Sequence, residues 1–369
     1  MSTQSRAVGG TEHNWCRAVV GGTGIAVLAI ISSKNPDVSH LKNALHKLQI
    51  SHPILRSRLH YSPTANSYSS VTSPSPFNEI KYFNHSTTCQ ILENNQNISP
   101  LHLILEHELN QNAWVSSSCT IKHDVFFASV YALPGATRWV LVLRLHAAAC
   151  DRTTAVSLLR ELLTLMAIEE EETGFQQGQK EITMNKGEIS LAMEDLLPKG
   201  IVKKTLWARG VDMLSYSVNS LRFTNLRFKD AKSPRSTQGC KARGIKLCGA
   251  LGAAGLIAAH SSKSRSDHQK KKYGVVTLTD CRSILEPPLS NHHFGFYHSA
   301  ILNTHAIKGG EKLWELAEKV YTVFTHYKSC NKHLSDMADL NFLMCRAMEN
   351  PGLTPICLIE IMFDIGVRG

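Results

Sequence analysis

The chain has 369 residues, of which 43% are hydrophobic and 19% are charged, so it can bury a sizeable core and is neither a disordered chain nor a charged coiled coil. Lys and Arg number 40 against 30 Asp and Glu, a net charge of +10 that suits anionic partners such as phosphorylated small molecules. The ten cysteines are widely spaced without a CxxC pair, which argues against a zinc ribbon or a disulfide scaffold and fits a reducing cytosol.

The N-terminal part begins with a polar stretch, and we expect residues 1–14 to be flexible. Residues 15–20 and 25–32 are predicted to form two buried strands, with a glycine-rich turn between them. The apolar run 18–32 is short for a bilayer span and too interrupted by glycines for a signal peptide. We therefore expect a cytoplasmic protein without a membrane span.

A helix is predicted to follow from Asn35, because Asn35 can cap the helix and Pro36 suits its first turn. Residues 54–59 look extended, and the Ser- and Pro-rich stretch 61–76 is predicted to be a loop. Further along, residues 125–133 and 138–146 are predicted to be strands that form a hairpin, and residues 151–172 a long helix. These elements complete an N-terminal lobe that we expect to span residues 15–175.

The second half of the chain is predicted to contain a connecting segment, 176–239, with a crossover helix at 206–229, and an incomplete C-terminal lobe, 240–369. The Lys-rich stretch 261–272 has no interleaved aromatic residues, so a solvated loop is favoured over a nucleic-acid site. The elements expected in the C-terminal lobe are helices at 240–260, 310–327 and 340–348 and strands at 273–278 and 294–303.

The segment with the strongest chemical signal runs from His146 to Asp151. Because side chains alternate along a strand, Val142, Arg144 and His146 share one face, and His146 ends that strand. The small residues 147–149 leave space beside the ring, and Asp151 can both favour the helix N-terminus and hold an arginine. On spacing alone, an interior histidine and an ordinary helix cap are the better interpretation.

His146 and Asp151 nevertheless resemble the HxxxD region of the acyltransferases that share the chloramphenicol acetyltransferase fold, including alcohol acetyltransferases and the condensation domains of peptide synthetases. Further segments resemble that family in the family's order, over about residues 15–300: Thr23-Gly24-Ile25, His52-Pro53-Ile54-Leu55-Arg56, Gly244-Ile245-Lys246-Leu247, Thr279-Asp280-Cys281-Arg282, Pro287-Pro288 and Phe294-Gly295-Phe296.

The resemblance implies a two-lobed α/β fold with mixed sheets and transfer of an acyl group from acyl-CoA to an alcohol or amine. His146 would be the general base that takes the acceptor's proton. Asp151 would point away from the substrate and orient the loop by pairing with Arg282. Acyl-CoA is then a co-substrate, no cofactor is bound permanently, no metal is required, and we expect a monomer.

Two departures from the family pattern keep alternatives open. Four residues, rather than three, separate His146 from Asp151. Either the loop bulges by one residue, or Asp151 is not equivalent, or the family's His-His doublet places Ala147 where the base should stand. The family's DFGWG-like motif is also absent from the sequence. The alternative function is therefore a catalytically inactive, condensation-domain-like binding protein or a truncated isoform.

Two weaker signals complete the candidates. The stretch from Val19 to Gly24 resembles the start of a dinucleotide loop, but position 27 holds Val where a third glycine should stand. An NAD-binding protein would have a parallel sheet starting at residue 17. Cys150 beside Asp151 is a candidate nucleophile, although most lone cysteines are small buried hydrophobes.

Overall fold

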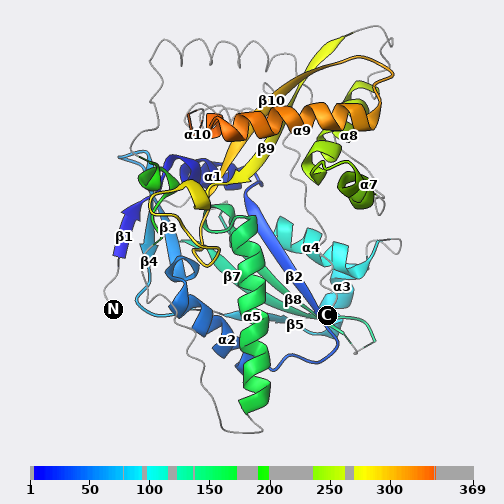
Figure 1. Ribbon diagram of the computed structural model, residues 1–369. Coiled ribbons are helices and arrows are strands. Elements are labelled where there is room, and N and C mark those ends of the chain that lie inside the picture. Colours follow the sequence, from blue (N-terminus) through cyan, green and yellow to red (C-terminus); the bar gives the residue numbers. More distant parts are fainter. Residues whose placement is uncertain are drawn as a thin grey trace. The chain divides into compact units, whose positions relative to one another are not determined.

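The computed structural model describes residues 4–77, 79–93, 98–114, 123–135, 138–172, 190–198, 236–261, 270–335 and 337. The chain divides into two compact units, Met1–Pro198 with Cys281–Tyr297, and Lys199–Asp280 with His298–Gly369 (Figure 1). The helices predicted at 206–229 and 340–348 lie outside the described residues. The return of Cys281–Tyr297 to the first unit is not apparent from the sequence pattern.

A four-stranded sheet in the order β2-β8-β7-β5 is the centre of the first unit. The predicted hairpin is confirmed, since β7 and β8 pair antiparallel, and their nearly continuous apolar sequences are buried. Because β2 also pairs antiparallel with β8, the sheet is not the parallel one of a dinucleotide-binding fold. The strands are β2 (Ile25–Ser32), β5 (Ile80–Phe83), β7 (Phe126–Ala132) and β8 (Trp139–His146).

Helices pack around this sheet (Figure 1). A buried cluster of Ile104, Tyr131, Val140 and Val142 joins α4 to one face of the sheet. The predicted long helix is confirmed as α5, which packs against α2, and α2 begins at an Asp37 cap rather than at Asn35. The helices are α2 (Val38–Ser51), α3 (His85–Leu92), α4 (Pro100–Asn110) and α5 (Arg152–Glu172).

A smaller sheet, β1-β4-β3-β6, corrects the expected loop at 61–76, because half of that stretch lies in β3 and β4. The exchange of backbone hydrogen bonds with β3 holds the Ser-rich β4 in the strand. Single 3₁₀ turns, η1 (Pro53–Arg56) and η3 (Met193–Leu196), complete the connections of this region. The strands are β1 (Gln4–Ala7), β3 (Ser57–Ser62), β4 (Ser67–Thr72) and β6 (His123–Asp124).

The predicted strand at residues 15–20 is wrong, because this stretch belongs to helix α1 (Gly10–Val20). At the start of the helix, the Glu12 carboxylate accepts a hydrogen bond from the Gly9 N–H, which is one half of a capping box. Glu194 of η3 caps the same end by accepting hydrogen bonds from the N–H and hydroxyl of Thr11. These caps outweigh the extended preference of the apolar residues that follow.

The second unit contains a two-stranded antiparallel sheet of β9 and β10. One helix was expected at 240–260, but two are present, and Gly244 separates them with a left-handed φ of 63°. Gly249 lets α8 approach α9 closely, since a Cβ there would lie 2.9 Å from the Ala317 carbonyl. The elements are α7 (Ser236–Ala242), α8 (Leu247–Ser261), β9 (Lys271–Asp280), β10 (His298–Ile307), α9 (Leu313–Ser329) and α10 (Lys332–Ser335).

Among the described residues, no helix is both long and apolar enough to cross a bilayer.

Candidate active site

The end of β8 is held on both sides by main-chain hydrogen bonds. The His146 N–H donates to the Val125 carbonyl at 2.9 Å, and the Ala147 N–H donates to the Gly24 carbonyl at 2.8 Å. Gly24 has a left-handed φ of 79°, and a Cβ there would lie 3.2 Å from the Trp15 ring. The chain then makes one 3₁₀ turn, η2 (Ala147–Ala149), before α5 begins. The backbone beside His146 is therefore rigid.

The imidazole of His146 is fully buried, with 0% of the residue exposed. Its Nδ1 accepts a hydrogen bond from the Ala148 N–H at 3.0 Å. A backbone N–H can only donate, so the neutral ring carries its proton on Nε2. The Trp114 ring stands edge-on to the imidazole, with 5.2 Å between centroids, and its indole N–H donates to the Asp124 carbonyl at 3.1 Å.

A buried polar cluster joins the C-terminal end of α4 to strands β7 and β8. Arg144, two residues before His146 on the same face of β8, lies 3.4 Å from the Glu108 carboxylate and donates to the Gln111 carbonyl. Tyr131 donates its hydroxyl proton to the other oxygen of Glu108 at 2.6 Å. Burial, with the nearby Glu108 carboxylate, raises the pKa of Tyr131 well above its usual range. The cluster positions the segment that leads to Trp114.

Asp151 forms a buried ion pair with Arg282, the partner that the family resemblance suggested. The Arg282 Nη1 lies 2.8 Å from Asp151 Oδ2, and the two side chains are 3% and 1% exposed. Arg282 also donates to the main-chain carbonyl of His293 at 3.1 Å. It belongs to η4 (Arg282–Ile284), at the start of the Cys281–Tyr297 segment.

The remaining lone pairs of Asp151 are used as well. Oδ1 accepts a hydrogen bond from the Thr154 N–H at 2.8 Å, which caps α5, and Oδ2 accepts from the Tyr297 N–H at 2.8 Å. The Thr154 hydroxyl and the Gly295 carbonyl are 2.9 Å apart. Asp151 thus acts as a structural joint between α5 and the 281–297 segment.

Cys150 does not have the properties of a nucleophile. The thiol is buried, and burial together with the neighbouring Asp151 carboxylate raises its pKa well above the usual range. A nucleophilic cysteine needs the opposite shift, toward a thiolate at neutral pH. Within the described part of the chain, no group of three or more His, Cys, Asp or Glu residues could hold a metal ion.

A second joint, which the sequence reasoning missed, lies at the middle of α5. The Glu161 carboxylate contacts His52 Nε2 at 2.6 Å and His292 Nδ1 at 2.8 Å. The Phe294 ring stacks on the His52 ring, with 3.6 Å between centroids and an interplanar angle of 4°. The three polar partners lie more than a hundred residues apart, so no local motif could have indicated them.

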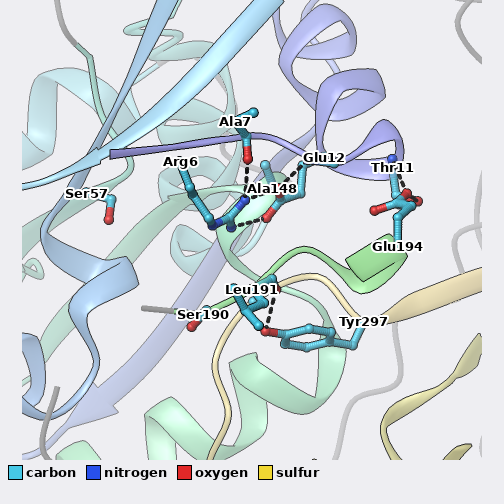
Figure 2. Close-up of polar contacts among 12 residues, drawn as sticks. Arg6, Ala7, Thr11, Glu12, Ser57, Ala148, Ser190, Leu191, Glu194 and Tyr297 are labelled. Atoms are coloured by element: carbon cyan, nitrogen blue, oxygen red, sulfur yellow. Dashed lines mark hydrogen bonds and ion pairs between the residues drawn. The ribbon is translucent and has the colours of Figure 1, made fainter. Parts of the chain in front are cut away.

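Strand β1 and helix α1 add an ion pair beside the 147–149 turn. Figure 2 shows Arg6 and Glu12 close to Ala148, and α1 packs against η2. The Arg6 guanidinium binds the Glu12 carboxylate through two hydrogen bonds of 2.6 and 2.7 Å. The same view contains Tyr297, whose hydroxyl donates to the Leu191 carbonyl at 3.0 Å. Burial raises the pKa of Tyr297 to about 12.

No protein-family model matches the sequence, and no curated protein matches it. Solved structures match its fold. The first condensation domain of the calcium-dependent antibiotic synthetase is 12% identical, with a TM-score of 0.61 over 90% of this chain and 76% of that one. The TRI3 trichothecene 15-O-acetyltransferase from Fusarium sporotrichioides is also 12% identical, with a TM-score of 0.63 over 95% and 77%.

Polyketide synthase associated protein 5 from Mycobacterium tuberculosis matches with 13% identity and a TM-score of 0.55, over 89% of this chain and 75% of that one. The chain therefore shares the mixed α/β fold of these condensation-domain and acetyltransferase structures, which is the fold class that the sequence resemblance predicted. At this level of identity the likeness extends to the fold alone.

Proposed function

We propose that this chain is a binding protein built on the acyltransferase fold, which takes up a small acyl donor such as acyl-CoA, or its acceptor, without transferring the acyl group. The net charge of +10 favours the phosphates of coenzyme A. Catalysis by the fold would need a base at the end of β8, and the residues around that point argue against one.

The observation that carries the proposal is the ion pair of Asp151 with Arg282. The aspartate of the family's HxxxD motif pairs with an arginine and fixes the loop. The Asp151–Arg282 pair therefore supports the assignment of Asp151 to that position of the motif. Three residues then separate Asp151 from position 147, which is Ala. The loop before Asp151 contains one 3₁₀ turn, Ala147–Ala149. With position 147 as the first residue of the motif, the loop has the family's length and requires no bulged residue. A methyl group stands where the base would be.

His146 does not readily replace the missing base. Its Nδ1 already accepts the Ala148 N–H, so Nε2 presents a proton rather than a lone pair in the neutral ring. To accept a proton at Nε2, the ring would have to change tautomer and turn an N–H toward the Ala148 N–H. That conflict of two donors disfavours general-base catalysis in this conformation.

A second candidate function is acyl transfer with His146 as the general base and acyl-CoA as the donor. It is favoured by the position of His146 at the end of strand β8, two residues after Arg144, which is held by its ion pair with Glu108. It requires a conformation in which the Ala148 hydrogen bond is broken and the ring becomes accessible.

Thiol release from a panel of acyl-CoAs, each with alcohol and amine acceptors, tests both functions. Under the binding proposal the wild-type chain binds acetyl-CoA in a calorimetric titration but releases no coenzyme A above background. Ala147→His restores an imidazole at the proposed position, and we expect release to appear, since a placed base is worth about 10²–10⁴ in rate.

His146→Ala separates the two candidates. The binding proposal predicts that this variant binds acetyl-CoA like the wild type. If the wild-type chain releases coenzyme A and His146→Ala abolishes that release without loss of folding, the second candidate is correct. If neither an acyl-CoA nor an acceptor in the panel produces a binding signal, the binding role itself is refuted.

A further inference from the structure

The outer edge of β2 is unusual among the sheet edges of the first unit. In the described residues β2 pairs only with β8, so it forms one edge of the four-stranded sheet. Its eight residues, Ile-Ala-Val-Leu-Ala-Ile-Ile-Ser, include no charge, no proline and no glycine. An edge strand of this kind presents a row of main-chain donors and acceptors with nothing to discourage another strand.

The other sheet edges of the same unit carry the usual protection. β5, at the opposite edge of the same sheet, is only four residues long and contains Lys81. In the smaller sheet, β1 is four residues long and contains Arg6, while β6 is two residues long. Short length and charged side chains are the common devices against edge-to-edge pairing. β2 is the exception, because it is twice as long as β1 or β5 and contains no charged residue.

The side chains around this edge are also incompletely covered. Seven of the eight β8 residues are buried, whereas no residue of its neighbour β2 is. Ile31 is 50% exposed, and Leu109, in the last turn of the helix α4 that packs on β2, is 46% exposed. Apolar area is therefore available beside the unpaired main chain, on the face that α4 covers.

We propose that β2 pairs antiparallel with β2 of a second copy of this chain. A two-fold axis perpendicular to the sheet brings residues of the same face together, so two four-stranded sheets join into one continuous sheet. Because the strand is uncharged, self-pairing brings no like charges together, although the chain as a whole has a net charge of +10. One symmetric contact satisfies both exposed edges, which makes a dimer a better occupant than an unrelated strand. This departs from the monomer expected from the sequence.

The test is the oligomeric state of the full chain, measured by sedimentation velocity over a wide concentration range. The wild type should show a concentration-dependent monomer–dimer equilibrium. Ile31→Lys places a charge at the pairing edge and should raise the dimer Kd at least about a hundredfold. Ile50→Lys on α2 is the matched control, because Ile50 is also 50% exposed, and it should leave the Kd unchanged.

Amide hydrogen exchange of the wild type gives a second readout that needs no variant. The main-chain amides of 25–32 should exchange more slowly at high than at low protein concentration, and the amides of β5 should not change. A wild-type chain that stays monomeric at every concentration overturns the proposal. Equal effects of Ile31→Lys and Ile50→Lys would place the dimer contact elsewhere.

Discussion

The 281–297 segment is attached to α5 at two points, and the two attachments differ in how much water reaches them. Arg282 and Asp151 form a dry ion pair near the start of the helix, with further hydrogen bonds to the carboxylate. At Glu161 the partners are His52, which is mostly buried, and His292, whose side chain is 73% exposed. The first joint is rigid because its charges cannot be left unpaired, and the second is adjustable because solvent can replace the exposed His292.

The difference teaches that similar contacts on one helix have different roles. At the first joint, loss of a partner leaves a buried charge, so the segment cannot leave α5 without a large cost. At the second joint, the His292 imidazole is hydrated when it leaves Glu161, because its side chain is largely exposed. The buried joint sets the position of the turn after His146, and the outer joint adds pH-dependent stability.

The largest effect is expected for Arg282→Met, which leaves the Asp151 carboxylate buried without its charged partner. Removing one member of a buried ion pair costs about 3–5 kcal/mol, and the free energy of unfolding from urea titration should fall by this amount. Arg282→Lys keeps the charge but loses the two-pronged geometry, and it should recover part of the loss. A decrease in the free energy of unfolding of less than about 1 kcal/mol, which is the range of exposed ion pairs, would show that water reaches the Asp151–Arg282 pair.

An intermediate effect is expected for Glu161→Gln, which keeps the shape of the side chain but removes its charge. A hydrogen bond to a charged group contributes about 1.5–3 kcal/mol. The glutamine side chain keeps one acceptor oxygen, so the variant should lose about one such bond near neutral pH. Burial acts to raise the pKa of Glu161, but the hydrogen bonds and charges of His52 and His292 outweigh it, so its pKa lies below the ordinary 4.5.

The sign of this shift fixes the pH dependence of the same variant. A carboxylate with a lowered folded-state pKa contributes stability that is complete above its unfolded value and is lost as the pH falls through the folded value. The stability difference between wild type and Glu161→Gln should therefore shrink as the pH falls below 4.5. A difference that grows on acidification would contradict the assigned cause.

The smallest effect is expected for His292→Ala, because the removed ring is mostly solvated. Exposed ion pairs contribute about 0–1 kcal/mol, and thermal unfolding should show a correspondingly small change. His52→Ala should cost more than His292→Ala, since His52 also stacks on Phe294. Equal losses for the two variants would mean that stacking and burial contribute nothing to the second joint.

Patterns that depend on near neighbours along the chain predicted much of the first unit correctly. Apolar runs and a turn signal identified the β7–β8 hairpin, and helical spacing identified α2 and α5. The pairing of Asp151 with Arg282 was predicted across 131 residues only because the family resemblance supplied a partner for the aspartate. The roles of His146 and of acyl-CoA stay predictions.

The errors have a common cause, which is stabilisation by distant residues. Residues 15–20 favour a strand by composition, yet Glu194 caps α1 from far along the chain. The polar β4 is a strand because the distant β1 pairs with it as well as the neighbouring β3, and composition alone predicts a loop. The contact of Trp114 with His146 depends on the cluster around Glu108 and Arg144, and a single sequence has no signal for it.

The buried arginine joint also constrains the order of events during synthesis. Asp151 leaves the ribosome 131 residues before Arg282, a delay of roughly ten seconds at ordinary translation rates. Throughout that interval the aspartate has no guanidinium to neutralise it, so the nascent first unit cannot reach its final packing around α5. Its completion has to wait until the chain has been translated through Tyr297, and by then β9 of the second unit has also been made.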